Sequence, residues 1–107
     1  MTIAEIRAAV EAGRWFMSQH AAERAKMRYI EDESLARLIA EGEVIEDYPE
    51  DPRGPSALVL TWDEGRCPMH AVCAFDPDGS LVIITVYTPK PPKWLDERTR
   101  NPKGGQQ

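Results

Sequence analysis

The sequence predicts an α+β fold in which two to three N-terminal helices pack on a four-stranded antiparallel sheet. Segments with the apolar spacing of helices come first in the chain, and β-rich segments joined by short turns follow them. A parallel sheet would need crossover segments of roughly a dozen or more residues, which the β-rich part of the chain lacks. The length of 107 residues fits one domain, which we expect to span residues 1–97 and to be followed by a flexible tail at 98–107.

The first helix is predicted over residues 3 to 12, where apolar residues recur at helical spacing. Thr2 and Glu5 have the spacing of a capping box, in which each side chain accepts a hydrogen bond from a free backbone N–H group. Gly13 can adopt the left-handed conformation that ends a helix. Residues 14–17 are short and largely apolar, so we expect either a packed linker or a brief strand there.

A second helix is predicted over about residues 19 to 29, with Ser18 as its N-cap. One stripe of this helix, at positions i, i+3, i+4 and i+7, contains His20, Glu23, Arg24 and Met27. If the stripe faces the edge of the sheet, its histidine and arginine can take part in chemistry. If it faces solvent, it is an ordinary exposed helix face with a His–Glu or Glu–Arg pair.

A third helix and two strands complete the first part of the predicted fold. Asp32 is expected to cap this helix, and Gly42 to close it. Two β-rich segments follow, Val44–Tyr48 and Ser56–Trp62. Prolines and a glycine punctuate residues 49–55 between them, so no helix can run through that loop.

The centre of the predicted sheet is a hairpin within residues 65–87. Two apolar runs flank an Asp-Pro-Asp-Gly turn at 76–79, in which proline presets φ and glycine supplies a positive φ. A loop centred on this turn pairs Phe75 with Leu81. Both faces of the hairpin are largely apolar, which indicates central strands with helices on one side and the segment that contains Trp94 as a candidate to shield part of the other.

The same register separates the polar residues of the hairpin. It pairs Ala71 with Thr85 and Met69 with Tyr87, so strand alternation puts these four residues on one face. His70 then lies on the other face. Only a β-bulge near Pro68 or a one-residue slip would bring His70 to the face of Thr85 and Tyr87.

Cys67, His70 and Cys73 have side chains of the types that bind zinc, spaced three residues apart. In an extended strand His70 points away from Cys73, so the three cannot converge on one ion without a bulge. The sequence therefore predicts no metal site, and the cysteines are interpreted as small buried apolar groups.

Charge is distributed unevenly along the chain. Residues 1–87 contain 8 Lys and Arg against 16 Asp and Glu, whereas residues 88–107 contain 5 against 2. An acidic body repels a phosphate backbone, which disfavours a general nucleic-acid-binding module unless arginines gather on one face. No apolar run approaches the roughly 20 residues that cross a bilayer, and the N-terminal segment lacks the basic start and apolar block of a signal peptide. We therefore expect a cytoplasmic protein without a membrane partner.

Five short blocks stand out in order along the chain: His20–Arg24, Ile45–Pro49, Asp51–Ser56, Arg66–His70 and Ile84–Tyr87. With Pro89 and Trp94, these blocks, which include an HA-x-ER motif and a TVY strand, resemble an uncharacterised bacterial domain-of-unknown-function family. The resemblance covers nearly the whole chain. The family is similar to RelE-like and barnase-like toxin nucleases, which implies helices before a four-stranded antiparallel sheet.

The resemblance implies a toxin-like component of a bacterial toxin–antitoxin system that cleaves RNA without a metal or cofactor, with a zinc-ribbon antitoxin-like protein as partner. Such cleavage needs a base for the 2′-hydroxyl, an acid for the leaving 5′-oxygen and cations for the phosphate charge. The residues offered for catalysis are His20, Arg24, His70, Thr85 and Tyr87, and those offered for substrate binding are Arg28, Arg53 and Arg66. The alternative is a non-catalytic module whose acidic body and proline-rich tail dock another protein.

Overall fold

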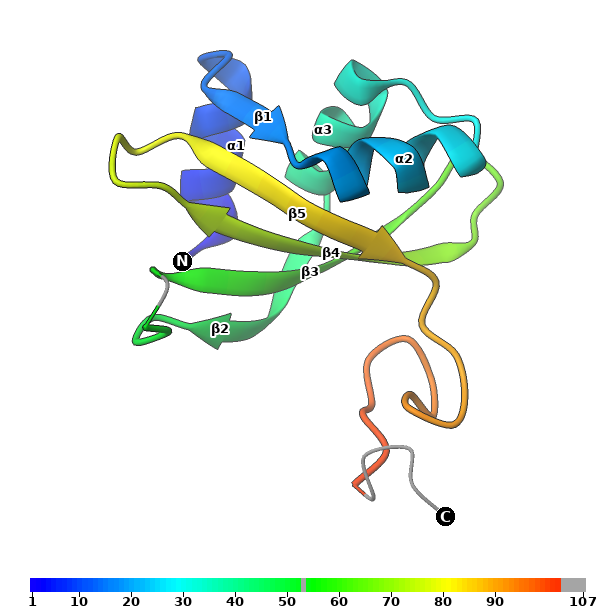
Figure 1. Cartoon of the computed structure of the whole chain (residues 1–107). Coiled ribbons are helices and arrows are strands. Elements are labelled where there is room, and N and C mark those ends of the chain that lie inside the picture. Colours follow the sequence, from blue (N-terminus) through cyan, green and yellow to red (C-terminus); the bar gives the residue numbers. More distant parts are fainter. Residues whose placement is uncertain (53, 103–107) are drawn as a thin grey trace.

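The computed structural model describes residues 1–52 and 54–102, which form three helices and a five-stranded sheet. The helices are α1 (Ile3–Glu11), α2 (Gln19–Met27) and α3 (Asp32–Ala40). The strands are β1 (Trp15–Met17), β2 (Glu43–Tyr48), β3 (Ser56–Trp62), β4 (Pro68–Phe75) and β5 (Leu81–Tyr87), in the spatial order β1-β5-β4-β3-β2. The helices lie on one side of the sheet, and the chain after β5 continues on the other side (Figure 1). The predicted α+β class is confirmed.

The prediction of four antiparallel strands is wrong, because β1 adds a fifth strand at the edge of the sheet and pairs with β5 in parallel. Leu81 N–H donates to the carbonyl of Arg14 at 2.9 Å, and Ser18 N–H donates to the carbonyl of Ile83 at 3.0 Å. Three residues are too few to show a strand period, so the sequence could only leave a brief strand open as an alternative. The sheet is therefore mixed.

The helix starts follow local side-chain chemistry. Thr2 and Glu5 form the predicted capping box, with Glu5 N–H donating to Thr2 Oγ1 at 3.2 Å and Thr2 N–H donating to Glu5 Oε1 at 2.8 Å. Ser18 caps α2 as predicted. The third helix begins one residue early, because Glu31 occupies the N-cap and Asp32 is already helical.

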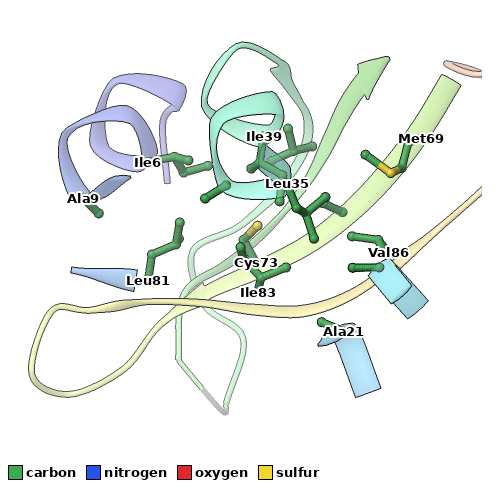
Figure 2. Packing of buried hydrophobic residues seen from close by; sticks show 14 residues of the cluster. Ile6, Ala9, Ala21, Leu35, Ile39, Met69, Cys73, Leu81, Ile83 and Val86 are labelled. Carbon is green, nitrogen blue, oxygen red and sulfur yellow. The ribbon is translucent and has the colours of Figure 1, made fainter. Parts of the chain in front are cut away.

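The core lies between the helices and one face of the sheet (Figure 2). Ile6, Leu35 and Ile39 from the helices pack there with strand residues that include Cys73. Burial raises the pKa of the Cys73 thiol to about 12, so Cys73 is an apolar core residue, as predicted. Cys67 is exposed, contrary to that prediction, and neither cysteine is in a disulfide.

The hairpin between β4 and β5 keeps its predicted register only from the turn to the Cys73–Ile83 pair. Beyond that pair β5 contains one extra residue, Ile84. Val72 therefore pairs with Thr85, whereas an uninterrupted register would pair it with Ile84. This irregularity is a β-bulge, in which one strand has an additional residue and the facing of its side chains reverses.

The bulge changes which residues of β5 face the helices. Val86 enters the core beside Met69, while Thr85 and Tyr87 turn to the opposite face. His70 pairs directly with Tyr87, so the predicted Met69–Tyr87 pair is wrong. The bulge buries an apolar valine in place of a tyrosine hydroxyl, which avoids the cost of an unpaired polar group in the core.

Candidate functional site

The face of the sheet opposite the helices is partly covered by residues 88–102, which we call the C-terminal segment. Trp94 in this segment is 1% exposed, and its ring lies 4.4 Å from the His70 ring at 85°. Leu95 N–H donates to the carbonyl of Thr99 at 2.8 Å, which closes a turn directly after the tryptophan. The segment is therefore docked through Trp94 as far as residue 102, and the remainder of the predicted flexible tail, 103–107, lies outside the described residues.

His70 is fully buried, and both of its ring nitrogens have partners. Nε2 lies 2.8 Å from the carbonyl oxygen of Glu97, and Nδ1 lies 3.1 Å from the hydroxyl of Tyr87. A carbonyl can only accept, so we assign the proton to Nε2 and infer that Nδ1 accepts the Tyr87 proton. Burial lowers the pKa of His70 below its ordinary value, in keeping with a neutral imidazole.

Tyr87 joins the buried histidine to the surface of the protein. Burial raises the pKa of Tyr87, and this effect exceeds the opposite influence of the nearby Trp94 indole N–H. That N–H lies close to Tyr87 but makes no hydrogen bond of good geometry within the part of the chain that the structure describes. Tyr87 therefore keeps its proton at neutral pH and directs it to His70.

Arg100 and Glu46 form a two-bond ion pair at the edge of this face, with 3.2 Å between Nε and Oε2 and 2.9 Å between Nη2 and Oε1. The Arg100 guanidinium also lies 4.6 Å from the centre of the Trp94 ring. Burial would raise the pKa of Glu46, but hydrogen bonds from Arg100 and Tyr48 outweigh it and hold that pKa low. The pair fixes the C-terminal segment to β2.

Two cavities, each of about 320 Å³, meet at Tyr87 and Arg100. The first, the basic pocket, is also lined by Lys90 and Lys93. The second, the sheet-face groove, continues over the open face of β2, β3 and β4. A further cavity of about 600 Å³ is lined by residues 47–52, and none of these described residues is a histidine or a basic residue.

The structure does not bring His20 and Arg24 together with His70 and Tyr87. Both lie on the exposed side of α2, which packs on the helix side of the sheet through alanines. The sheet separates this stripe from the face of His70. The stripe of α2 that contains His20 and Arg24 is therefore an ordinary exposed helix face and does not face the edge of the sheet.

The remaining predicted residues lie at different distances from this site. Thr85 shares the face of His70 but lies beside Val72 rather than in either cavity. Arg28 donates a hydrogen bond to Thr88, a residue of the basic pocket. Arg66 is exposed in the turn after β3, with φ of 65°. Arg53 lies outside the described residues.

The catalytic and substrate-binding residues expected from the sequence do not include those that the C-terminal segment supplies. These are Lys90, Lys93, Trp94 and Arg100. A signal was available, since the basic charge concentrated beyond residue 87 accompanies a tryptophan suited to anchoring. Trp94 docks on the face opposite the helices, the side for which the apolar hairpin made its segment a candidate.

Metal ligands are not grouped in this site. Within residues 1–52 and 54–102 no three His, Cys, Asp or Glu side chains are placed so as to hold a metal ion. Cys73 points into the helix-side core while His70 points to the opposite face, as strand alternation requires.

No helix within residues 1–52 and 54–102 is long and apolar enough to cross a membrane.

A family model described as a domain of unknown function (DUF4258) matches residues 17–88, more than half of the chain. No curated protein matches the chain. The matched range runs from the end of β1 to the residue after β5 and so includes His70 and Tyr87. Trp94 and three cationic residues of the site, Lys90, Lys93 and Arg100, lie beyond the matched range.

Proposed function

The chain belongs to the DUF4258 family, whose function is unknown, and we propose that this member is a metal-independent ribonuclease that binds an RNA phosphate in the basic pocket. The observation that most favours this function is the hydrogen bond between Tyr87 and His70, because it ends at the junction of the two cavities. A titratable relay beside a cationic pocket has the two components that RNA cleavage needs.

The first component is a base for the 2′-hydroxyl. The Tyr87 oxygen accepts the 2′-hydroxyl proton while its own proton passes to Nδ1 of His70. The imidazolium that forms keeps its Nε2–H bond to the Glu97 carbonyl and returns an Nδ1–H bond to Tyr87. Burial disfavours this charge, and the Glu46 carboxylate favours it, so the cation serves as a short-lived intermediate.

The second component is positive charge for the phosphate. The 2′-oxygen attacks phosphorus, the bond to the 5′-oxygen breaks, and a 2′,3′-cyclic phosphate forms. The leaving 5′-oxygen takes a proton from a lysine ammonium of the pocket or from water. Lys90 and Lys93 have no ion pair within the part of the chain that the structure describes, so their charge is available to the phosphate.

The acidic body limits how tightly RNA can bind. The whole chain has a formal net charge of −5, and two arginines of the C-terminal segment, Arg98 and Arg100, are already paired with Glu43 and Glu46. Binding thus depends on a few local cations, and we expect it to be weak and sensitive to salt.

We propose further that the protein acts as the toxin of a bacterial toxin–antitoxin pair, with a zinc-ribbon protein as its partner. The motif resemblance supports this role. The alternative, a non-catalytic module that offers its proline-rich tail to another protein, is less favoured because Trp94 already docks that tail on the sheet.

The test is cleavage of an RNA oligonucleotide by the purified chain in EDTA. Tyr87→Phe keeps the ring and removes the hydroxyl, so we expect the rate to fall at least about 100-fold. Tyr29→Phe is the matched control, since Tyr29 is 97% exposed on another part of the surface, and it should cleave at the wild-type rate. A Tyr87→Phe variant as active as the wild type would exclude the relay, and intact RNA with all proteins would exclude the ribonuclease.

A further inference from the structure

Among the described residues, the sheet-face groove is rich in hydrogen-bond acceptors, and its charged donor, Arg100, lies at the end that joins the basic pocket. Its hydroxyl groups already donate to protein acceptors: Tyr48 to Glu46 at 2.5 Å, Ser56 to Asp51 at 3.0 Å and Tyr87 to His70 at 3.1 Å. A hydroxyl has one proton and two lone pairs, so these three groups can only accept a further bond. The carboxylate of Glu46 is an acceptor as well.

The floor of the groove is apolar, with Leu58 and Val72 on it and the ring of Tyr48 at its side. Its volume of about 320 Å³ is at the lower end of the range for ligand pockets, which is about 300 to 1,000 Å³. An apolar floor with polar atoms at its rim suits a flat aromatic ring that is hydrogen-bonded along its edge.

The groove is continuous with the basic pocket through Tyr87 and Arg100. In a ribonucleotide, the sugar bearing the 2′-hydroxyl joins the base to the 3′-phosphate. With that hydroxyl at Tyr87 and the phosphate among the lysines, the base falls on the side of the groove. The order of the cavities therefore matches the order of groups in one nucleotide.

We propose that the groove is a nucleobase subsite that prefers guanine on the 5′ side of the cleaved bond, an inference that rests on the ribonuclease function above. Guanine presents the N1–H and N2–H₂ donors side by side, which matches a rim of acceptors. Uracil presents one N–H between two carbonyls, and the lone pairs of these carbonyls would meet the acceptor atoms of the rim without a hydrogen bond. A basic peptide also supplies donors, but Lys90, Lys93 and Arg100 at the junction repel it.

The experiment titrates the isotope-labelled full chain with the four ribonucleoside 3′-monophosphates and with inorganic phosphate, following amide chemical shifts by NMR. We expect 3′-GMP to bind at least about tenfold more tightly than 3′-UMP, a difference of about 1.4 kcal/mol, and 3′-UMP to bind about as weakly as phosphate. Val72→Phe fills the floor of the groove and should reduce the affinity for 3′-GMP to that for phosphate. Lys93→Ala should instead weaken phosphate and all four nucleotides together.

The outcomes separate this subsite from the ribonuclease activity. Equal affinity for the four nucleotides, unchanged by Val72→Phe, overturns the subsite and leaves the ribonuclease proposal in place. Guanine preference without RNA cleavage supports the subsite and refutes the ribonuclease. An arginine-rich peptide that shifts the groove amides where no nucleotide does so overturns the subsite in favour of a peptide site.

Discussion

Replacing Trp94 with alanine should both destabilise the protein and open the site. The side chain is 1% exposed and makes an edge-to-face contact with His70, and the Arg100 guanidinium lies over its ring. The substitution removes the apolar contact that anchors the C-terminal segment to the sheet. The hydrogen bonds of His70 to Tyr87 and to the Glu97 carbonyl do not involve the tryptophan.

The expected loss follows from the buried area of the ring. A tryptophan buries about 150 to 250 Å², which corresponds to about 4 to 6 kcal/mol at about 25 cal/mol per Å². Measured Trp→Ala changes in cores are about 3 to 5 kcal/mol, and the cation–π contact adds about 0.5 to 1 kcal/mol. Because a surface segment can relax into the gap, we expect a loss of about 3 kcal/mol in the free energy of unfolding.

Urea denaturation of the wild type and the variant measures that loss, and NMR titration follows the pKa of His70. With Trp94 gone, water reaches the imidazole, so its pKa should rise toward the ordinary value of about 6.5. Trp62→Ala is the control, since Trp62 is 38% exposed and its loss should matter less. An unchanged unfolding free energy and an unchanged His70 pKa would refute the packing of the C-terminal segment described above.

Three further predictions concern other parts of the molecule. Because burial lowers the folded-state pKa of His70, the unfolded chain binds the proton more readily, and the free energy of unfolding should fall as the pH drops below about 6.5. Denaturation at several pH values should show that His70→Asn lacks this part of the pH dependence. A thiol reagent should modify exposed Cys67 in the folded protein and Cys73 only after unfolding, as mass spectrometry would show; modification of both at equal rates in the native protein would contradict the burial. Gly42→Ala would place a Cβ 2.4 Å from the Leu60 carbonyl oxygen, so thermal denaturation should reveal a loss near the upper end of about 1–3 kcal/mol, and an unchanged melting temperature would speak against this close approach.

Much of the fold follows from local sequence chemistry. The capping box at Thr2, the serine cap of α2 and the turn at 76–79 each act over a few residues, so the sequence alone predicts them. The class and order of the main elements follow from these and from apolar spacing. Strand β1 does not, because only its contact with β5 makes three residues a strand.

The candidate site depends on a bulge that no local pattern predicts. Strand alternation assigned His70 and Tyr87 to opposite faces, and the extra residue Ile84 reverses that assignment. Tertiary contacts decide which residues of β5 face the helices, because Val86 is buried against them and Tyr87 is hydrogen-bonded to His70 on the opposite face. The docking of Trp94 is likewise a long-range packing effect, for which the sequence offered only a candidate face.

The central claim is that Tyr87 takes the 2′-hydroxyl proton of an RNA bound across the two cavities. Mass spectrometry of the products from an RNA oligonucleotide incubated with the wild-type chain in EDTA tests it most directly. We predict fragments that end in 2′,3′-cyclic phosphate, their near absence with Tyr87→Phe, and no cleavage of the matching DNA, which lacks the 2′-hydroxyl. Cleavage of the DNA, or cyclic phosphate ends produced equally by Tyr87→Phe, would contradict the claim.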